Sequence, residues 1–303
     1  MNPLLRRLQS TARGQAGALF RVASKPIGGG GGLRHAALGP LAGGEDLTGQ
    51  VVLVTGASSG IGEAAARQVA AAGATVVLVA RSAGALERIA AEIDAAGPGR
   101  AEARPCDLTN LDAIDALCDE ILADHDAVDV LVNNAGRSIR RSVDQSEERF
   151  HDFERTMQLN YFAAIKLIMR LLPAMRAQGH GQVVNVSSAG VQIRTPRFSG
   201  YIASKAALEA FSDAVQAEAL ADGVRFTTIS MPLVRTPMIT PTKQYESIPA
   251  LTPEEAGRLV SEAIGGRPRR VAPPFAHVFS TVDRLSPETM DTIRNRVYRM
   301  FPE

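Results

Sequence analysis

Val51-Val-Leu-Val-Thr-Gly-Ala-Ser-Ser-Gly-Ile-Gly62 is the stretch of sequence that decides the fold of this chain. Its first four residues are all apolar, which predicts a strand buried on both faces, as in a parallel sheet. Gly56, Gly60 and Gly62 then mark a sharp turn, and Ala64 to Ala72 has the composition of a helix packed close to the strand. This succession of strand, glycine turn and helix is typical of a phosphate-binding site.

The glycine turn has the properties that a pyrophosphate requires. Backbone N–H groups at a helix start are unpaired and partly positive, and glycines let the backbone approach the phosphates. The spacing is Gly-x3-Gly-x-Gly rather than the dinucleotide fingerprint Gly-x-Gly-x2-Gly, so a tight strand–helix turn without a ligand is the alternative. The candidate cofactor residues in this turn are Gly56, Ser58, Ser59, Gly60, Ile61 and Gly62.

The overall composition indicates a soluble, enzyme-sized, cytoplasmic protein. Its 303 residues allow one large α/β domain or two small ones, and an apolar content of 45% is ample for a core. A net charge of +1 gives no general attraction to nucleic acid, and no Cys/His cluster has the spacing of a metal site. Cys106 and Cys118 are too few for a disulfide framework, and no apolar run approaches the roughly 20 residues that span a bilayer.

Residues 1–45 differ from the rest of the chain, for which we expect a single domain over 46–303. The extension is basic, with no acidic residue before Glu45, and it contains a glycine run at 28–32. A flexible tail, a basic helix on a membrane surface over about 1–25 and an organellar transit peptide all fit this composition. Peripheral membrane contact therefore stays open.

The second strand, Thr75 to Ala80, ends without an acidic residue. In dinucleotide-binding sheets an acidic side chain at this end holds the adenosine ribose hydroxyls and would repel a 2′-phosphate. Here Ala80 is followed by Arg81, whose guanidinium suits a phosphate. The sequence thus favours NADP(H) over NAD(H), with a solvated surface charge as the alternative for Arg81 alone.

Two later strands end in polar residues that would face the same edge of the sheet. Ala101 to Leu108 contains Asp107, which would accept from the adenine amino group or cap the helix that begins near Asn110. Val128 to Val132 is followed by Asn133-Asn134-Ala135-Gly136. Asn side chains can tie strand ends together, and Gly136 leaves room for a flat ligand.

Further polar residues follow in the second half of the chain. Asn160 lies inside a long helical segment that we expect from about Glu147 to Met175, and Ser188 follows the fifth expected strand. Tyr201 and Lys205 stand four residues apart at the start of an Ala-rich helix, so they share one helix face.

Tyr201, Lys205 and Ser188 have the chemistry needed to protonate a carbonyl oxygen. The ordinary pKa of tyrosine is near 10, and an ammonium one turn away favours the phenolate and moves that pKa toward neutrality. Ser188 would add a second hydrogen bond to the substrate oxygen as negative charge develops. An ordinary amphipathic helix face is the alternative for the pair, but the chain uses only four lysines.

Together these motifs resemble the short-chain dehydrogenases/reductases. Thr55-Gly56…Gly60-Ile61-Gly62, Asn133 to Gly136, Asn160, Ser188 and Tyr201…Lys205 occur in family order over roughly residues 46–272. The resemblance implies a single doubly wound parallel sheet of the Rossmann type, with about seven strands in the order 3-2-1-4-5-6-7 and helices on both faces.

The same resemblance implies roles for individual residues. It makes Asn160, Ser188, Tyr201 and Lys205 the catalytic tetrad, with Asn160 holding a water that relays protons to Lys205 and Lys205 binding the nicotinamide ribose. It also implies a homodimer or homotetramer formed through helices near 149–177 and 204–221. Besides the glycine turn, Arg81 and Asp107, the cofactor contacts would be Asn134, Ala135, Gly136, Tyr201, Lys205 and Thr236.

One departure leads to a narrower resemblance. Many family members have Pro-Gly after the sixth strand, whereas this chain has Met231-Pro232 and retains Thr236. The surrounding loops look like those of bacterial long-chain fatty acyl-CoA reductases, which use NADPH and convert an acyl thioester into a fatty aldehyde. The stretches that carry this resemblance are 133–141, 150–161, 231–242, Arg267 to Arg270 and Phe301-Pro302.

A thioester substrate makes further demands on the chain. Neither cysteine stands where a nucleophile is needed, so hydride would attack the thioester directly and Tyr201 would protonate its oxygen. Arg137, Arg140 and Arg141 follow the fourth strand and could meet the phosphates of coenzyme A, with solvated loop charge as the alternative.

Two C-terminal segments would complete an acyl site. Residues 237–252 have the length and position of a lid, and the helical segment over 274–301 carries an apolar stripe that fits core packing or, alternatively, a membrane-facing edge. We therefore expect NADPH-dependent reduction of a long-chain acyl-CoA or other lipid carbonyl, with no metal and no nucleic acid. A ketone or β-keto-acyl reductase and a non-catalytic NADP-binding sensor are the alternatives.

Overall fold

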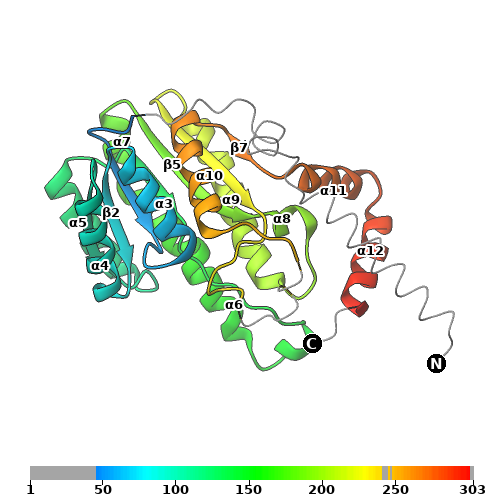
Figure 1. Cartoon of the computed structure of the whole chain (residues 1–303). Coiled ribbons are helices and arrows are strands. Elements are labelled where there is room, and N and C mark those ends of the chain that lie inside the picture. Colours follow the sequence, from blue (N-terminus) through cyan, green and yellow to red (C-terminus); the bar gives the residue numbers. More distant parts are fainter. Residues whose placement is uncertain (1–45, 241–244, 246–247, 301–303) are drawn as a thin grey trace, which may run out of the picture.

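The strands form one parallel sheet in the order β3-β2-β1-β4-β5-β6-β7, in a computed structural model that describes residues 46–240, 245 and 248–300 (Figure 1). The expected doubly wound sheet and its strand order are confirmed. Residues 1–45, part of the expected lid and Phe301-Pro302 lie outside the described residues. The strands are β1 (Val51–Thr55), β2 (Thr75–Ala80), β3 (Arg100–Pro105), β4 (Val130–Asn133), β5 (Gly181–Ser188), β6 (Val224–Met231) and β7 (Arg270–Val271).

Successive residues of β1 enter different cores. Val52 and Val54 pack on one face of the sheet and Leu53 on the other, and all three are completely buried. A central parallel strand has no solvent face, so each position favours an apolar side chain, whose burial contributes about 1.5–3 kcal/mol relative to exposure. This is why the opening stretch lacks the alternation of a half-exposed strand.

Helices cover both faces of the sheet. α3, α4 and α10 share one apolar core with the sheet, and α5, α7 and α9 share the other. α10 lies so close to α3 that a Cβ added to Gly257 would stand 2.7 Å from the backbone carbonyl carbon of Ala64. The bounds of these helices are α3 (Gly60–Ala71), α4 (Ala83–Ala96), α5 (Leu111–His125), α7 (Ala163–Ala177), α9 (Ser199–Ala219) and α10 (Pro253–Gly266).

The strand order reverses between β1 and β4, and this places the candidate site. β1 continues to β2 and β3 on one side, while β4 continues to β5, β6 and β7 on the other. The connections that leave the carboxyl ends of β1 and β4 therefore run in opposite directions, and a crevice opens between them. The glycine turn follows β1, and Asn133 to Gly136 follows β4, so both motifs flank this crevice.

The prediction of one long helix from about Glu147 to Met175 is wrong, because this range is not a continuous α-helix. A 3₁₀ turn covers Asp144–Ser146 (η1), α6 covers Phe150–Met157, and a π-helical turn over Gln158–Phe162 (η2) joins α6 to α7. A π turn accepts hydrogen bonds from one residue further along the chain than an α turn does, and such turns are frequent at functional sites. Asn160, in its middle, is 1% exposed.

The C-terminal segment adds two helices beside the sheet. α11 (Pro274–Leu285) packs against the short α8 (Ala189–Ile193) and against α12 (Pro287–Met300), as seen on the right of Figure 1. Only part of the apolar stripe of α12 packs into the protein: Met290 is buried, whereas Ile293 and Val297 are exposed. Within the described ranges, every helix is too short or too polar to cross a membrane.

Candidate active site

Thr55 and Asn134 join the ends of β1 and β4. The Thr55 hydroxyl donates to the Val132 carbonyl at 3.0 Å and accepts from the N–H groups of Asn134 and Ala135 at 2.9 and 3.0 Å. The Asn134 side chain donates in return to the Thr55 carbonyl at 2.9 Å. The expected tie between strand ends is therefore made by Asn134, which fixes one wall of the crevice.

The glycine turn needs its glycines for steric reasons. Gly56 and Gly60 have φ angles of 67° and 60°, in the left-handed region that favours glycine. A Cβ on Gly62 would stand 2.3 Å from the carbonyl oxygen of Gly56, so no side chain fits between the turn and α3. Ser58 lies in the turn, and Ile61 packs against the core from the first turn of the helix.

The N–H groups at the start of α3 are not capped by the side chain of the N-cap residue. Ser59 is the N-cap residue, and its side chain makes no capping hydrogen bond to the N–H groups of the first turn. Those donors then point to the crevice with the positive end of the helix dipole, which suits a pyrophosphate. Thr236, which follows β6 along the chain, lies beside the glycine turn, because a Cβ on Gly60 would stand 3.0 Å from its methyl group.

Arg81 and Asp107 lie together beyond the ends of β2 and β3. Arg81 is exposed, and β3 ends at Pro105, so Asp107 stands in the loop rather than in the strand as expected. Hydrogen bonds from the Thr109 backbone and hydroxyl hold the pKa of Asp107 below its ordinary value, with smaller effects from the charges of Arg81 and Arg137. The expected helix-capping role belongs instead to Asn110, which accepts from the N–H groups of Asp112 and Ala113.

Asn160 is clamped onto the loop that follows β4. Its Oδ1 accepts from the Arg137 N–H at 2.7 Å, and its Nδ2 donates to the Arg137 carbonyl at 2.9 Å. Nδ2 also donates to the Ser204 hydroxyl at 2.9 Å, which donates to the Tyr201 carbonyl at 2.7 Å. The π turn therefore connects the β4 loop with the first turns of α9.

Ser188 and Tyr201 form a hydroxyl pair. The Ser188 oxygen accepts from the Gly190 N–H at 3.1 Å and thereby caps α8. Burial raises the pKa of Tyr201, and a hydrogen bond from Ser188 opposes part of this rise. The downward pKa shift expected from the charge of Lys205 is not found, and Tyr201 stays protonated at neutral pH.

Lys205 is buried beside Asn160, with 4% of its surface exposed. Its ammonium donates to the Val186 carbonyl at 2.9 Å. Burial lowers the pKa of Lys205 to about 8, and the negative charge of Glu209 opposes that change. A Cβ on Gly136 would stand 3.3 Å from Asn160 Oδ1 and 3.4 Å from Lys205 Nζ, so both polar groups meet above this glycine.

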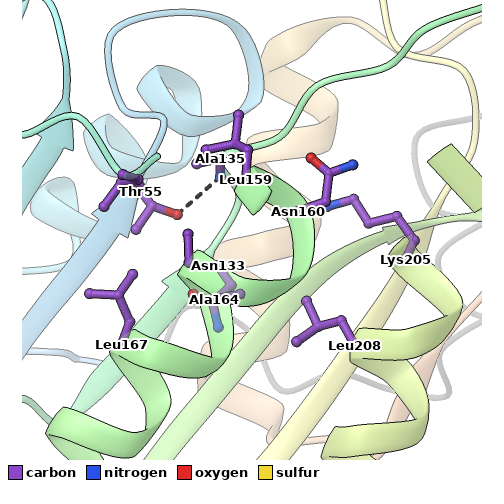
Figure 2. Close-up of a pocket in the computed structure, with 11 residues that line it drawn as sticks. Thr55, Asn133, Ala135, Leu159, Asn160, Ala164, Leu167, Lys205 and Leu208 are labelled. Carbon is purple, nitrogen blue, oxygen red and sulfur yellow. Dashed lines mark hydrogen bonds between the residues drawn. The ribbon is translucent and has the colours of Figure 1, made fainter. Parts of the chain in front are cut away.

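A small cavity lies behind these groups, between β4, α7 and α9 (Figure 2). Its volume is about 10 Å³, and its polar lining includes Thr55, Asn133, Asn160 and Lys205. Asn133 donates to Asn185 at 3.0 Å, while its own side-chain oxygen is buried without a hydrogen-bond partner among the described residues. The cavity is thus a polar recess directly under the candidate site.

The sequence analysis did not identify Glu209 and Ser187 as part of the site, and both are buried. Glu209 lies one helical turn after Lys205 and is 8% exposed, and the Ser187 hydroxyl donates to its carboxylate. Burial raises the pKa of Glu209. The spacing of four residues after Lys205 was the available signal, but nothing in the sequence shows that this face of α9 is buried.

The segment after β6 is closed at its base. Val234 pairs with Leu251 as an isolated bridge, and the Arg235 guanidinium donates to the carbonyls of Tyr245, at 2.6 Å, and Ile248. Tyr245 is partly buried, and burial raises its pKa, while the positive charge of Arg140 opposes that rise. Tyr245 therefore lies within electrostatic reach of Arg140 and Tyr201.

Other reactive groups lie away from the site or are inert. Cys106 and Cys118 are both buried, and burial raises the pKa of Cys118 to about 12, so its thiol is a poor nucleophile. Within the described part of the chain, no three His, Cys, Asp or Glu side chains are grouped so that they could hold a metal ion.

Comparisons with known proteins agree with this arrangement. The sequence model of a family described as short chain dehydrogenase matches residues 50–247. An uncharacterized oxidoreductase of Mycobacterium tuberculosis is 53% identical over 257 residues, which cover 84% of this chain and 75% of that protein. A fatty acyl-CoA reductase of Acinetobacter baylyi is 51% identical over 258 residues, which cover 85% of this chain and 87% of that protein.

Solved structures with the same fold were determined with either cofactor. A metagenomic short-chain oxidoreductase in complex with NADP is 31% identical, with a TM-score of 0.64 over 75% of this chain and 96% of that one. A 3-ketoacyl-(acyl-carrier-protein) reductase from Brucella melitensis complexed with NADH is 26% identical, with a TM-score of 0.68 over 75% of this chain and 97% of that one.

Proposed function

Because the chain belongs to the short-chain dehydrogenase/reductase family of oxidoreductases, we propose that it uses NADPH to reduce a long-chain fatty acyl-coenzyme A thioester to the fatty aldehyde. The observation that carries the proposal is the hydrogen-bonded pair of Ser188 and Tyr201, one helical turn from the buried ammonium of Lys205. The name and the 51% identity of the Acinetobacter relative support the choice of a thioester.

The cofactor fits the glycine turn and the end of β2. The space that a Cβ on Gly62 would fill and the uncapped donors at the start of α3 suit a pyrophosphate. Arg81, without an acidic residue at the end of β2, would bind a 2′-phosphate and so favour NADP(H) over NAD(H). When bound, NADPH supplies the hydride; the chain's own residues bind, orient and protonate.

Tyr201 would donate the proton that a reduced carbonyl oxygen needs. Because burial raises its pKa, the hydroxyl holds that proton at neutral pH. Ser188 would hold the same oxygen by a second hydrogen bond. Lys205 would hold the nicotinamide ribose, and Asn160, clamped on Arg137, would keep the lysine side of the site in place.

A thioester is compatible with this machinery because no enzyme nucleophile is required. Addition of hydride to the carbonyl carbon and of a proton from Tyr201 to the oxygen gives a hemithioacetal. Its carbon–sulfur bond then breaks, the hydroxyl loses its proton, and the products are the aldehyde and the coenzyme A thiol. The burial of both cysteines agrees with direct attack rather than a covalent acyl-enzyme.

The acyl and coenzyme A parts would lie on the side of the site bordered by the β4 and β6 loops. Arg140 would meet a phosphate of coenzyme A, and the segment closed by Val234 and Leu251 would cover the acyl chain. The Arg137 charge acts on Asp107, so we propose that it serves the cofactor end of the crevice. A homodimer or homotetramer would cover Phe162 and Met169, two exposed apolar side chains at η2 and α7.

The experiment follows the released thiol. Protein, NADPH and palmitoyl-CoA are mixed with a thiol reagent, and coenzyme A release is recorded together with NADPH oxidation. We expect one thiol for each NADPH consumed and a long-chain aldehyde as the product. NADPH oxidation without thiol release would contradict the thioester assignment.

A second candidate is reduction of a β-keto group on a long acyl chain. The 3-ketoacyl reductase from Brucella melitensis shares the fold at 26% identity, and one proton donor and one hydride serve both reactions. A β-keto-acyl thioester that is reduced to the hydroxy-acyl product while its coenzyme A is retained would favour this candidate. NADPH binding without turnover on either substrate would favour a non-catalytic sensor.

A further inference from the structure

The chain between Ser188 and Tyr201 is held from outside by the C-terminal helices. Ser188 caps the start of α8, and Tyr201 lies in the first turn of α9, so this short connection carries both hydroxyls of the candidate site. α11 packs directly against α8, and Figure 1 shows the two side by side. The matched family segment ends at residue 247, so α11 and α12 lie beyond it.

A buried ion pair fastens the end of α8. Asp283 on α11 lies 2.6 Å from Arg294 on α12, and their side chains are 6% and 13% exposed. The Arg294 Nε–H donates to the carbonyl of Ile193, the last residue of α8, at 3.0 Å. Asp283 also pairs with Arg194 at 2.7 Å. The Asp283 carboxylate therefore holds the C-terminal end of α8 twice, directly at Arg194 and through Arg294 at Ile193.

A second contact lies three residues further on. The Arg197 guanidinium donates to the Tyr298 carbonyl at 3.2 Å and lies 4.0 Å from the centre of its ring. The φ angles of Arg194 and Arg197 are 56° and 71°, in the left-handed region that non-glycine residues rarely adopt. Such conformations cost energy that surrounding contacts offset. The Arg194 N–H donates to the Gly190 carbonyl and the Arg197 carbonyl accepts from the Arg141 N–H, both at 2.8 Å, and α11 and α12 add the side-chain contacts given above.

We propose that Asp283 is a positioning residue that sets the geometry of Ser188 and Tyr201 through Arg294 and α8; the catalytic part of this inference rests on the roles proposed above for the two hydroxyls. Without this carboxylate, the Arg294 guanidinium loses its buried charge partner, keeps only the exposed Asp291 and moves toward water. The Ile193 carbonyl then loses its donor, and α8 is released at the end opposite Ser188. The glycine turn belongs to β1 and α3, so the proposed pyrophosphate site keeps its geometry and we expect most of the NADPH affinity to remain.

The first test compares Asp283→Asn with the matched variant Asp291→Asn. Each removes one carboxylate near Arg294, but Asp291 is 76% exposed and lies 3.3 Å away on the same helix. Hydrogen exchange is measured on the full chain for peptides covering 189–200 and, as a reference, 60–96. We expect Asp283→Asn to speed exchange at 189–200 by about tenfold or more without changing the reference, and Asp291→Asn to match the wild type.

A milder variant guards against loss of folding. Arg294→Lys keeps a positive charge beside Asp283 but lacks the Nε–H that reaches Ile193, so it should raise exchange at 189–200 alone even if Asp283→Asn does not fold. Unchanged exchange at 189–200 in Arg294→Lys, or an equal rise in the reference peptide, overturns the proposal.

Activity provides the second readout, with NADPH and palmitoyl-CoA as probes. We expect Asp283→Asn to lower kcat by about tenfold or more while the Kd for NADPH stays within about twofold of the wild type, and Asp283→Glu to restore part of kcat. An equal loss of NADPH binding would mean general damage and contradict the positioning role. If the wild type itself does not reduce palmitoyl-CoA, the proposed function fails, and the exchange experiment alone decides on Asp283.

Discussion

Ser188 uses its hydroxyl in two directions. The oxygen accepts from the Gly190 N–H and so starts α8, while the proton is directed to Tyr201. A hydroxyl has one proton and two lone pairs, so a bound carbonyl competes with Tyr201 for the Ser188 proton and leaves the helix cap untouched. The side chain therefore combines a structural bond with the proposed chemical one.

Replacing Tyr201 by Phe removes the proposed proton donor but keeps the ring. We expect reduction to fall by about 10²–10⁴-fold, because a general acid contributes that much to a rate, while NADPH binding is retained. NADPH oxidation with palmitoyl-CoA and NADPH fluorescence measure the two quantities. Turnover within about tenfold of the wild type would remove Tyr201 from this role.

Lys205 makes the free energy of unfolding depend on pH. Its pKa is about 8 in the folded protein and 10.5 ordinarily, so the unfolded chain binds more protons between these values. The buried ammonium therefore destabilises the fold below pH 8, and this effect is relieved as the pH rises from 8 to 10.5. Tyr201, whose pKa is raised, acts in the opposite sense only above pH 10.

We expect the unfolding free energy of the wild type to rise, relative to that of Lys205→Met, by on the order of 3 kcal/mol between pH 7 and pH 10.5. Urea unfolding of both proteins at several pH values measures the difference, and Tyr201 is common to both. A difference that stays constant with pH would show that Lys205 keeps its ordinary pKa.

Arg81→Ala tests the choice between the two nicotinamide cofactors. Loss of a charged hydrogen bond to a 2′-phosphate should weaken NADPH binding by about tenfold or more and leave NADH almost unchanged. The matched control is Arg88→Ala. It removes an exposed arginine of α4 that pairs with Glu92 on the same helix. Equal weakening of both cofactors would return Arg81 to the status of a surface charge.

At the scale of elements, close helix packing depends on single glycines. Gly257→Ala on α10 would force a Cβ to within 2.7 Å of the α3 backbone, and we expect a loss of about 1–3 kcal/mol in unfolding free energy. Gly84→Ala on α4 meets nothing within 4 Å and should gain up to about 1 kcal/mol from helix propensity. Urea midpoints of the two variants should move in opposite directions.

The central strands could be predicted from local sequence, whereas the π turn could not. Val51–Thr55 and Thr75–Ala80 are apolar at successive positions because both faces are buried, and that pattern is visible in the chain. Around Asn160 the helical periodicity is also real, but tertiary bonds from the Asn160 side chain to Arg137 accompany the wider turn. Those bonds join residues 23 apart and leave no local pattern.

The same distinction applies to the site. Ser188, Tyr201 and Lys205 could be chosen by residue type and spacing, because the chemistry requires a hydroxyl pair and an ammonium. Glu209 could not, since its importance comes from burial against Ser187. The Asp283–Arg294 pair joins two helices beyond the matched family segment, and its partners are visible only in three dimensions.

At the scale of the whole molecule, the division at residue 45 remains a prediction, because residues 1–45 lie outside the described part. The sheet and its two helical layers need no residue before Asp46 for the contacts described above. If the basic extension binds lipid, its removal should leave the reductase core intact.

Deleting residues 1–44 should therefore spare turnover in solution and reduce binding to vesicles that contain anionic lipid. Co-sedimentation with such vesicles at low and high salt measures the effect, and NADPH oxidation provides the control. Vesicle binding equal to that of the full chain would contradict a surface helix and favour a plain tail.

The turn at Gln158–Phe162 holds one amino acid more than an α-helix between the same two ends would contain. If one residue of the turn is deleted, for example Tyr161, α6 and α7 can join as one continuous α-helix. α6 would then rotate by about 100° relative to α7 around their common axis. Asn160 would then lose its hydrogen bonds to Arg137. We therefore expect deletion of this single residue to abolish reductase activity while the sheet and its helices still fold.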